Sequence, residues 1–141
     1  MTTNTVARTA SVARVRETPL LRWVLELDGV GTGLNGLAYL VAAGWIGDRL
    51  GLPTALLYPA GAFLVLAGAV LVALSTRRVV PVAWLWGVVA INAVWVVDSV
   101  VVAAAGWFDL TTAGTVWVLA QAALVAGFAV VETVAIRRVA G

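Results

Sequence analysis

Four polar side chains recur along one face of the first hydrophobic segment, and they are the strongest candidates for chemistry. At about 100° per residue of helix, Asp28, Thr32, Asn35 and Tyr39 fall within about 60° of one another. Ionisable side chains inside a membrane usually face other helices or a wet cavity, and they often mark ion, proton or substrate pathways. The alternative is packing, in which these groups hydrogen-bond to neighbouring helices. The spacing identifies no substrate under either interpretation.

A second polar sector lies in the third hydrophobic segment, opposite a side rich in valine. Its members fall within about 120° of one another on a helix and are Asn92, Trp95, Asp98 and Ser99. If the first and third helices meet, this sector and the Asp28 face form a discontinuous line of polar groups through the bilayer. Such a line indicates a permeation or proton path, and structural hydrogen bonding is again the alternative.

The fourth hydrophobic segment adds two polar residues on one face, Gln121 and Glu132. Gln121 can join the central polar groups. Glu132 lies close in sequence to Arg137 and Arg138, so we expect it to form an ion pair at the inner membrane boundary. It is therefore not among the predicted site residues.

The composition restricts the class of protein. Of the 141 residues, 62% are hydrophobic and only 11% are charged, far from the balance of soluble domains. The chain has no cysteine and no histidine, which removes the usual zinc, copper and haem ligands, and we expect no metal and no cofactor. All nine basic residues are arginines in a chain poor in other charge, a pattern that does not favour nucleic-acid binding.

The elements that position these residues are four predicted transmembrane helices. Pro19, Pro53 and Pro81 each stand just ahead of an apolar run, where a helix can begin, and Asp109 or Thr111 can cap a fourth helix. Residues 1–18 are expected to form a flexible tail, and residues 19–138 one domain. The predicted spans are about 20–46, 54–75, 82–105 and 112–136. The short loops make consecutive helices antiparallel, so the predicted fold class is an all-α, transmembrane four-helix bundle.

The distribution of arginines along the chain predicts its orientation in the membrane. Eight of the nine lie in the N-terminal tail, at the start of the first helix, in the second loop and at the C-terminus, and only Arg49 lies on the other side. The positive-inside rule then places both termini in the cytoplasm and the protein in the inner (plasma) membrane. The expected partners are the lipid bilayer and either further copies in a homo-oligomer or another membrane protein.

An internal repeat is suggested by comparing the two halves. Residues 42–45 (AAGW) recur as residues 104–107, and residues 54–79 align with residues 114–139, both ending in Arg-Arg-Val. The alternative is chance similarity in an Ala-, Val- and Leu-rich background. A genuine repeat would relate two helical hairpins by an axis along the membrane normal, a parallel repeat.

A resemblance extends over roughly residues 20–138. It rests on Leu27-Asp28, on residues 32–40 (TGLNGLAYL), on Asn92 and Trp95 with Ser99, and on Trp117 with Gln121-Ala122. This combination resembles a group of small four-span integral membrane proteins from high-GC actinobacteria. The members are functionally uncharacterised, so the resemblance implies the topology and no activity.

Two classes of function remain open from the sequence. The first is a membrane protein that moves a small solute or protons, or that serves as a membrane accessory subunit. The second is a membrane-embedded enzyme acting on a lipid or isoprenoid, with Asp28 or Asp98 as acid or base, although no nucleophile and base pair supports it. A transporter predicts a polar path, and an enzyme predicts a lateral apolar pocket that ends at a carboxylate. An accessory subunit predicts only an unpartnered glycine or polar face.

Overall fold

The structure is a computed structural model that describes residues 13–140, and it is almost entirely helical. The helices are α2 (Pro19–Val41), α3 (Ala43–Leu50), α4 (Thr54–Ser75), α5 (Val82–Ala105) and α6 (Thr112–Ala140). Two short strands, β1 (Arg14–Arg16) and β2 (Val79–Pro81), complete the fold. The all-α prediction is confirmed.

Three of the described helices, α4, α5 and α6, are long and apolar enough to cross a membrane. This supports a membrane protein. Helix α2 has 23 residues, enough to reach across a bilayer, but Glu26, Asp28, Asn35 and its glycines make it less apolar than the other three. Two of these residues, Asp28 and Asn35, are among those singled out as candidates for chemistry.

The predicted boundaries hold for the second and third spans and fail at the first and fourth. Helices α4 and α5 begin and end at the predicted residues, whereas the predicted span 20–46 is broken at Ala42, which leaves the helical conformation between α2 and α3. Helix α3 then runs to Leu50 and ends at Gly51, whose φ of 75° suits glycine. Helix α6 continues to Ala140 instead of ending near residue 136.

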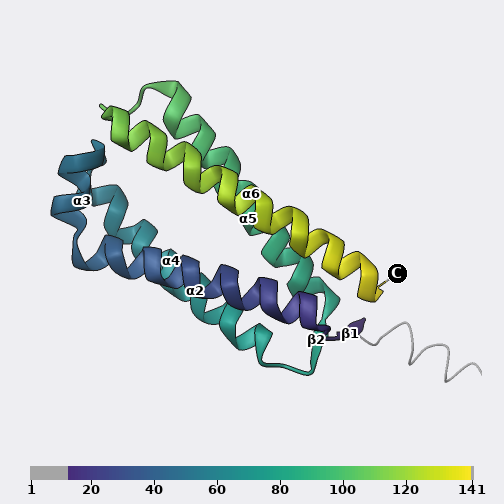
Figure 1. Cartoon of the computed structure of the whole chain (residues 1–141). Coiled ribbons are helices and arrows are strands. Elements are labelled where there is room, and N and C mark those ends of the chain that lie inside the picture. The colour runs from purple at the N-terminus through teal and green to yellow at the C-terminus, as the bar shows by residue number, and fades with distance from the viewer. Residues whose placement is uncertain (1–12, 141) are drawn as a thin grey trace, which may run out of the picture.

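The helices form two hairpins that face each other (Figure 1). Helix α2 packs along α4, and α5 packs along α6, and these are the two most extensive helix contacts in the structure. Across the two hairpins α2 contacts α6, whereas α4 and α5 make little contact along their lengths. The short helix α3 lies at one end of the molecule, here called the α3 end, and the strands lie at the other, here called the ribbon end (Figure 1).

Glycines set the close packing of the first hairpin. A Cβ atom on Gly36 would lie 2.7 Å from the backbone oxygen of Gly61, and one on Gly68 would lie 2.7 Å from the backbone oxygen of Gly29. Absent side chains therefore let the two backbones touch. Gly29, Gly33 and Gly36 of α2, here called the glycine strip, lie against α4 of the same chain.

At the ribbon end the structure differs from the sequence prediction, which placed residues 1–18 in a flexible tail. Strand β1 pairs antiparallel with β2, and Val15 stands opposite Val80. Both valines are buried while Arg14 and Arg16 remain exposed, which is the alternation of a half-buried strand. Residues 1–12, which hold the rest of the predicted tail, lie outside the described residues.

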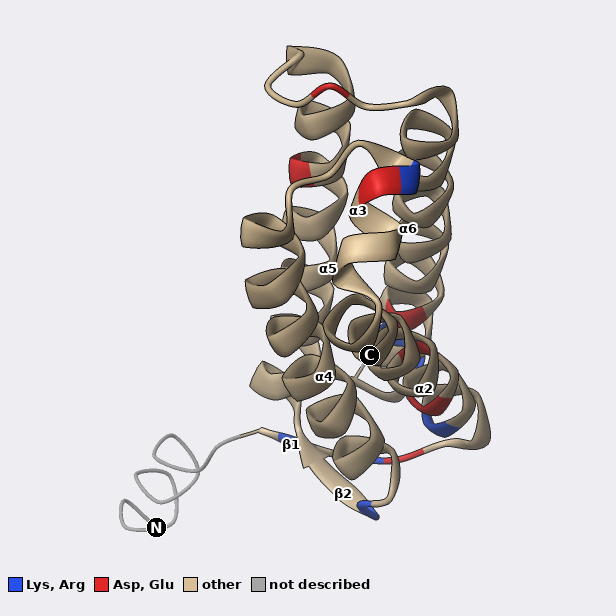
Figure 2. Ribbon diagram, turned by 90° about the vertical axis from the view of Figure 1, so that its left-hand side faces the viewer, with Lys and Arg blue, Asp and Glu red and all other residues tan. Residues whose placement is uncertain are grey.

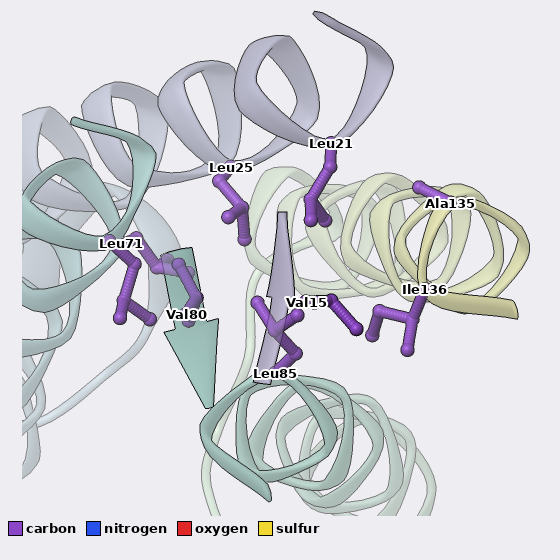
Figure 3. Packing of buried hydrophobic residues seen from close by; sticks show 9 residues of the cluster. Val15, Leu21, Leu25, Leu71, Val80, Leu85, Ala135 and Ile136 are labelled. Atoms are coloured by element: carbon purple, nitrogen blue, oxygen red, sulfur yellow. The ribbon is translucent and has the colours of Figure 1, made fainter. Parts of the chain in front are cut away.

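An apolar cluster closes the ribbon end (Figure 3). Side chains from both strands and all four long helices meet there: Val15, Leu21, Leu25, Leu71, Leu74, Val80, Leu85, Ala135 and Ile136. A second buried cluster near the α3 end contains Tyr39, Ala43, Leu52, Leu57 and Leu64. The residues considered next lie between these two clusters.

Candidate intramembrane site

Asp28, Asn92 and Glu132 form one buried hydrogen-bonded group, here called the carboxyl–amide cluster. The Asn92 Nδ2 atom donates to Asp28 Oδ2 at 2.9 Å and to Glu132 Oε2 at 3.0 Å. The exposed fractions of the three side chains are 1%, 9% and 0%. Helices α2, α5 and α6 each supply one member, so the cluster joins the two hairpins.

The neighbouring residues in the sequence determine where Asp28 and Asn92 lie. Asp28 precedes Gly29, which sits against Leu71 and Gly68 of α4, so the close α2–α4 contact fixes the rotation of α2. One turn later the Thr32 hydroxyl donates to Asp28 Oδ1 at 3.0 Å, as the helical spacing allows. Asn92 is the middle of three buried residues seven apart on α5, with Leu85 and Ser99, so it lies on the inward stripe of that helix.

The cluster holds two carboxyl groups and no basic side chain. The sequence has no arginine or lysine between Arg22 and Arg49 or between Arg78 and Arg137, and these intervals contain Asp28 and Glu132. In addition, Glu132 Oε1 is buried without a hydrogen-bond partner. Because uncompensated charge is costly inside a membrane, a proton or a bound cation must supply the balancing positive charge.

A cavity of about 450 Å³ lies beside the cluster and is here called the central cavity. All four long helices line it. Its polar lining groups include Asp28, Thr32, Asn35, Asn92 and Gln121, but most of its wall is apolar. Four aromatic side chains also line it: Phe63, Trp95, Trp117 and Phe128.

Aromatic contacts cross between the hairpins toward the α3 end. The Trp117 Nε1 atom donates to the Tyr39 hydroxyl at 2.9 Å and joins α6 to α2. The rings of Phe63 and Trp95 stack across α4 and α5, with centroids 6.2 Å apart and planes at 10°. The hydrogen bond from Trp117 gives Tyr39 a partner on a neighbouring helix, as the packing interpretation of the polar face predicted.

A smaller pocket of about 160 Å³, here called the outer pocket, lies nearer the α3 end. Asp98 and Ser99 line it, and it shares Trp95 and Gln121 with the central cavity. Ser99 is buried, whereas Asp98 is exposed. The predicted polar line is therefore brought together at Asp28 and Asn92, with Asn35 on the same cavity, while Asp98 belongs to the outer pocket.

Glu132 is the site residue that the sequence prediction missed. It was expected to pair with Arg137 and Arg138, but it is fully buried and accepts a hydrogen bond from Asn92, and both arginines are exposed. The reason is helical rotation: Glu132 lies near the buried residues Ala135 and Ile136 on the inward face of α6. Glu132 shares one face of α6 with Gln121 and Phe128, which line the central cavity. This shared face could have indicated from the sequence that Glu132 lies inside the bundle.

A third acidic group, Glu17, lies outside the helices between β1 and α2. Burial raises its pKa to about 7, and the charge of nearby Arg22 opposes that rise. Its Oε1 atom is buried without a hydrogen-bond partner, while its backbone N–H donates to Arg78 O at 3.0 Å. Glu17 belongs to the ribbon end and not to the central cavity.

The described part of the chain has no group of three or more His, Cys, Asp or Glu side chains that could hold a metal ion. Comparison with known proteins adds no assignment, since no family model, curated protein or solved structure matches this chain. The function must be argued from the cluster and the cavities.

Proposed function

We propose that this protein is a four-span carrier that binds a proton or a small cationic solute inside the bilayer and passes it across. One observation carries this proposal. Asp28 and Glu132 share the amide of Asn92 beside a cavity of about 450 Å³, in stretches of the sequence (residues 23–48 and 79–136) that contain no basic residue. A site of this kind holds positive charge because nothing else in it compensates the carboxyl groups.

The polar path expected of a carrier is supported by two neighbouring pockets that share lining residues. The carboxyl–amide cluster lies in the half of the bundle nearer the ribbon end, and Asp98 lines the outer pocket nearer the α3 end. Trp95 and Gln121 line both pockets and separate them. Rotation of these two side chains would join the pockets without unfolding a helix.

The proposed orientation has both termini in the cytoplasm and α2 as the first span. Strand pairing and the ends of the helices place Arg14, Arg16, Arg22, Arg77, Arg78, Arg137 and Arg138 at the ribbon end, whereas Arg49 lies on α3 (Figure 2). This distribution matches the positive-inside rule if the ribbon end faces the cytoplasm. Because the chain lacks cysteine, single Cys replacements test it: those at Arg49 and Asp109 should be labelled from outside intact cells, and one at Thr76 should not.

The carrier proposal is tested by proton flux in liposomes. Purified protein is reconstituted into liposomes that contain a trapped pH-sensitive dye, and a potassium diffusion potential drives the flux. We expect Asp28→Asn and Glu132→Gln to remove the flux and Asp48→Asn, on the exposed surface of α3, to retain it. Flux no faster than in protein-free liposomes, with and without candidate organic cations outside, would refute the proposal.

An enzyme remains the second candidate because one observation favours it. The central cavity is mostly apolar and reaches a carboxyl group, as expected for a lipid or isoprenoid substrate with Asp28 as acid or base. A membrane accessory subunit is less well supported, because the glycine strip that could await a partner is already covered by α4. Turnover of added lipid extract, measured by mass spectrometry and lost in Asp28→Asn, would favour the enzyme.

A further inference from the structure

We propose that the central cavity binds a flat, lipophilic organic cation, and that this ligand enters sideways from the hydrocarbon between α4 and α5. The inference rests on the proposed function, because it takes the carboxyl–amide cluster as the group that balances the ligand's charge. It adds the chemical class of the ligand and its route. Both follow from the walls of the cavity and from the way the hairpins meet.

The walls favour a flat apolar ligand. A volume of about 450 Å³ lies in the range of small-molecule sites, which is roughly 300–1,000 Å³. Phe63, Trp95, Trp117 and Phe128 present aromatic rings around it. Aromatic rings stack on flat ligands and attract cations through their negative faces, most strongly where water is excluded.

The charges select a cation over an anion. Asp28 and Asn92 line the cavity, and Glu132 lies behind them with one unpartnered carboxyl oxygen. The cavity is lined by residues from three stretches, 23–48, 50–76 and 79–136, and these stretches contain no arginine or lysine that could hold an anion. Charge balance then requires that a bound cation replaces a proton of the cluster, and that this proton passes to water.

The entrance follows from the weak contact between α4 and α5. Leu66, Val70 and Ile91 line the cavity along this side, yet 67%, 42% and 48% of their surfaces are exposed. The apolar cluster closes the ribbon end, and the Tyr39–Trp117 hydrogen bond crosses the hairpins toward the α3 end. The side between α4 and α5 is therefore an open approach to the cavity, and in a four-span bundle it faces lipid.

The stacked pair at this opening suits a flat ligand. Phe63 comes from α4 and Trp95 from α5, and their nearly parallel rings bridge the gap with centroids 6.2 Å apart. A planar ring that enters beside them can continue the stack on either face. This pair therefore both marks the opening and supplies the first surface that the ligand meets.

The test uses N-methyl-phenylpyridinium, a flat aromatic cation, and methylbiphenyl, its uncharged isostere. Equilibrium binding of the radiolabelled probes is measured on the full chain in nanodiscs. We expect saturable binding of the cation, weakened at least about 10-fold by Asp28→Asn and several-fold by Phe63→Ala, on the scale of cation–aromatic contacts. Asp48→Asn is the matched control, and it should change the affinity less than about 2-fold because Asp48 lies on the exposed surface of α3, outside both the central cavity and the outer pocket.

The route is tested separately by narrowing the opening. Ile91→Trp places a larger ring at the rim, so it should slow association of the cation at least about 10-fold. Val116→Trp, on an exposed position of α6 outside the cavity, should leave the rate unchanged. This experiment does not depend on the folding of the Asp28 variant.

Four results would overturn the inference. The first is binding of the cation and methylbiphenyl that is equal and exceeds binding to empty nanodiscs. The second is an equal loss of affinity in Asp28→Asn and Asp48→Asn, and the third is no effect of Ile91→Trp on the association rate. Proton flux without binding of the cation would also refute the inference while leaving the carrier proposal intact. Saturable binding of the cation without flux would refute the carrier and support the cavity assignment.

Discussion

The two hairpins use their glycines in opposite ways. In α2 and α4 the facing positions are glycines, and the two backbones touch. In α5 and α6, Gly87 and Gly127 have open space around them, and a Cβ atom at either position would meet nothing within 4 Å. The first hairpin is therefore a tightly packed unit, and the second presents larger side chains to the space between the hairpins.

The alignment of the predicted internal repeat shows which residues of the second hairpin stand at the positions of these glycines. With the offset of 60 residues, Gly61 and Gly68 of α4 correspond to Gln121 and Phe128 of α6. With the offset of 62 residues that aligns the two Ala-Ala-Gly-Trp segments, Gly33 of α2 corresponds to Trp95 of α5. Gln121, Phe128 and Trp95 all line the central cavity. Where one hairpin has glycine for packing, the other has the walls of the candidate site.

The largest effect should come from filling the glycine contacts. Gly36→Ala puts a Cβ atom 2.7 Å from two backbone atoms, Gly61 O and Val65 N, which can only be relieved by moving the helices apart. We expect the free energy of unfolding to fall by about 1–3 kcal/mol, measured by denaturation in mixed micelles. Gly127→Ala is the matched control in the second hairpin and should leave stability unchanged or raise it by up to about 1 kcal/mol. Equal losses would show that the hairpins do not differ.

The carboxyl–amide cluster, which joins the hairpins, should give the next largest effect. Asp28→Leu removes the acceptor of Asn92 and Thr32 and should cost roughly 0.6–2 kcal/mol in the same unfolding measurement, the scale of an interhelical hydrogen bond. Asp28→Asn keeps a side-chain oxygen that can accept from Asn92 and should cost less, while it removes flux. If Asn retains full flux and Leu alone destabilises, the cluster is structural.

A smaller loss is expected where Tyr39 meets Trp117. Tyr39→Phe removes one hydrogen bond between α2 and α6 and keeps the buried ring, so stability should fall by about 0.6 kcal/mol. Tyr58→Phe on the exposed face of α4 is the control. A loss as large as that of Gly36→Ala would mean that the hairpins depend on each other more than on their internal contacts.

The smallest effect concerns the pH dependence contributed by Glu17. Its pKa is about 7 in the folded protein, above the ordinary value of 4.5, so the folded state binds the proton more tightly than the unfolded state. This contribution to stability is fully present below about pH 4.5 and is lost as pH rises through about 7. Unfolding measured from pH 5 to pH 8 should show a decline that Glu17→Gln reduces, and an unchanged slope in that variant would exclude Glu17 as the cause.

Much of the fold could be predicted because it depends on local signals. Pro53 and Pro81 mark the starts of α4 and α5, and Thr111 caps α6 through a hydrogen bond from Gly114 N at 3.0 Å. The break at Ala42 could not be predicted, because it depends on packing of α3 across the end of the bundle, where Gly47 lies against Leu52. Strand β1 was missed for a similar reason, since its partner lies 65 residues away.

The site was predicted in part. Asp28, Thr32, Asn35, Tyr39, Asn92, Trp95 and Gln121 were found from helical periodicity, which determines which residues share a face. Periodicity does not determine which helices pack against each other, or which residues of two neighbouring helices lie at the same level along the bundle axis. Glu132 was therefore assigned to the boundary by its sequence neighbours, and Asp98 was placed in the same line as Asp28 although it lines a different pocket.

The pairing of β1 with β2 has a consequence for the order of assembly during synthesis. Strand β1 leaves the ribosome before any long helix, but β2 follows only after α2, α3 and α4 have been made. The Val15–Val80 contact therefore closes a loop that contains the whole first hairpin, and it cannot form until the residues after α4 have been made. Glycine contacts let α2 and α4 pair beforehand. Closure of the ribbon is thus the step at which the N-terminal segment becomes anchored, after the first hairpin and as the second begins.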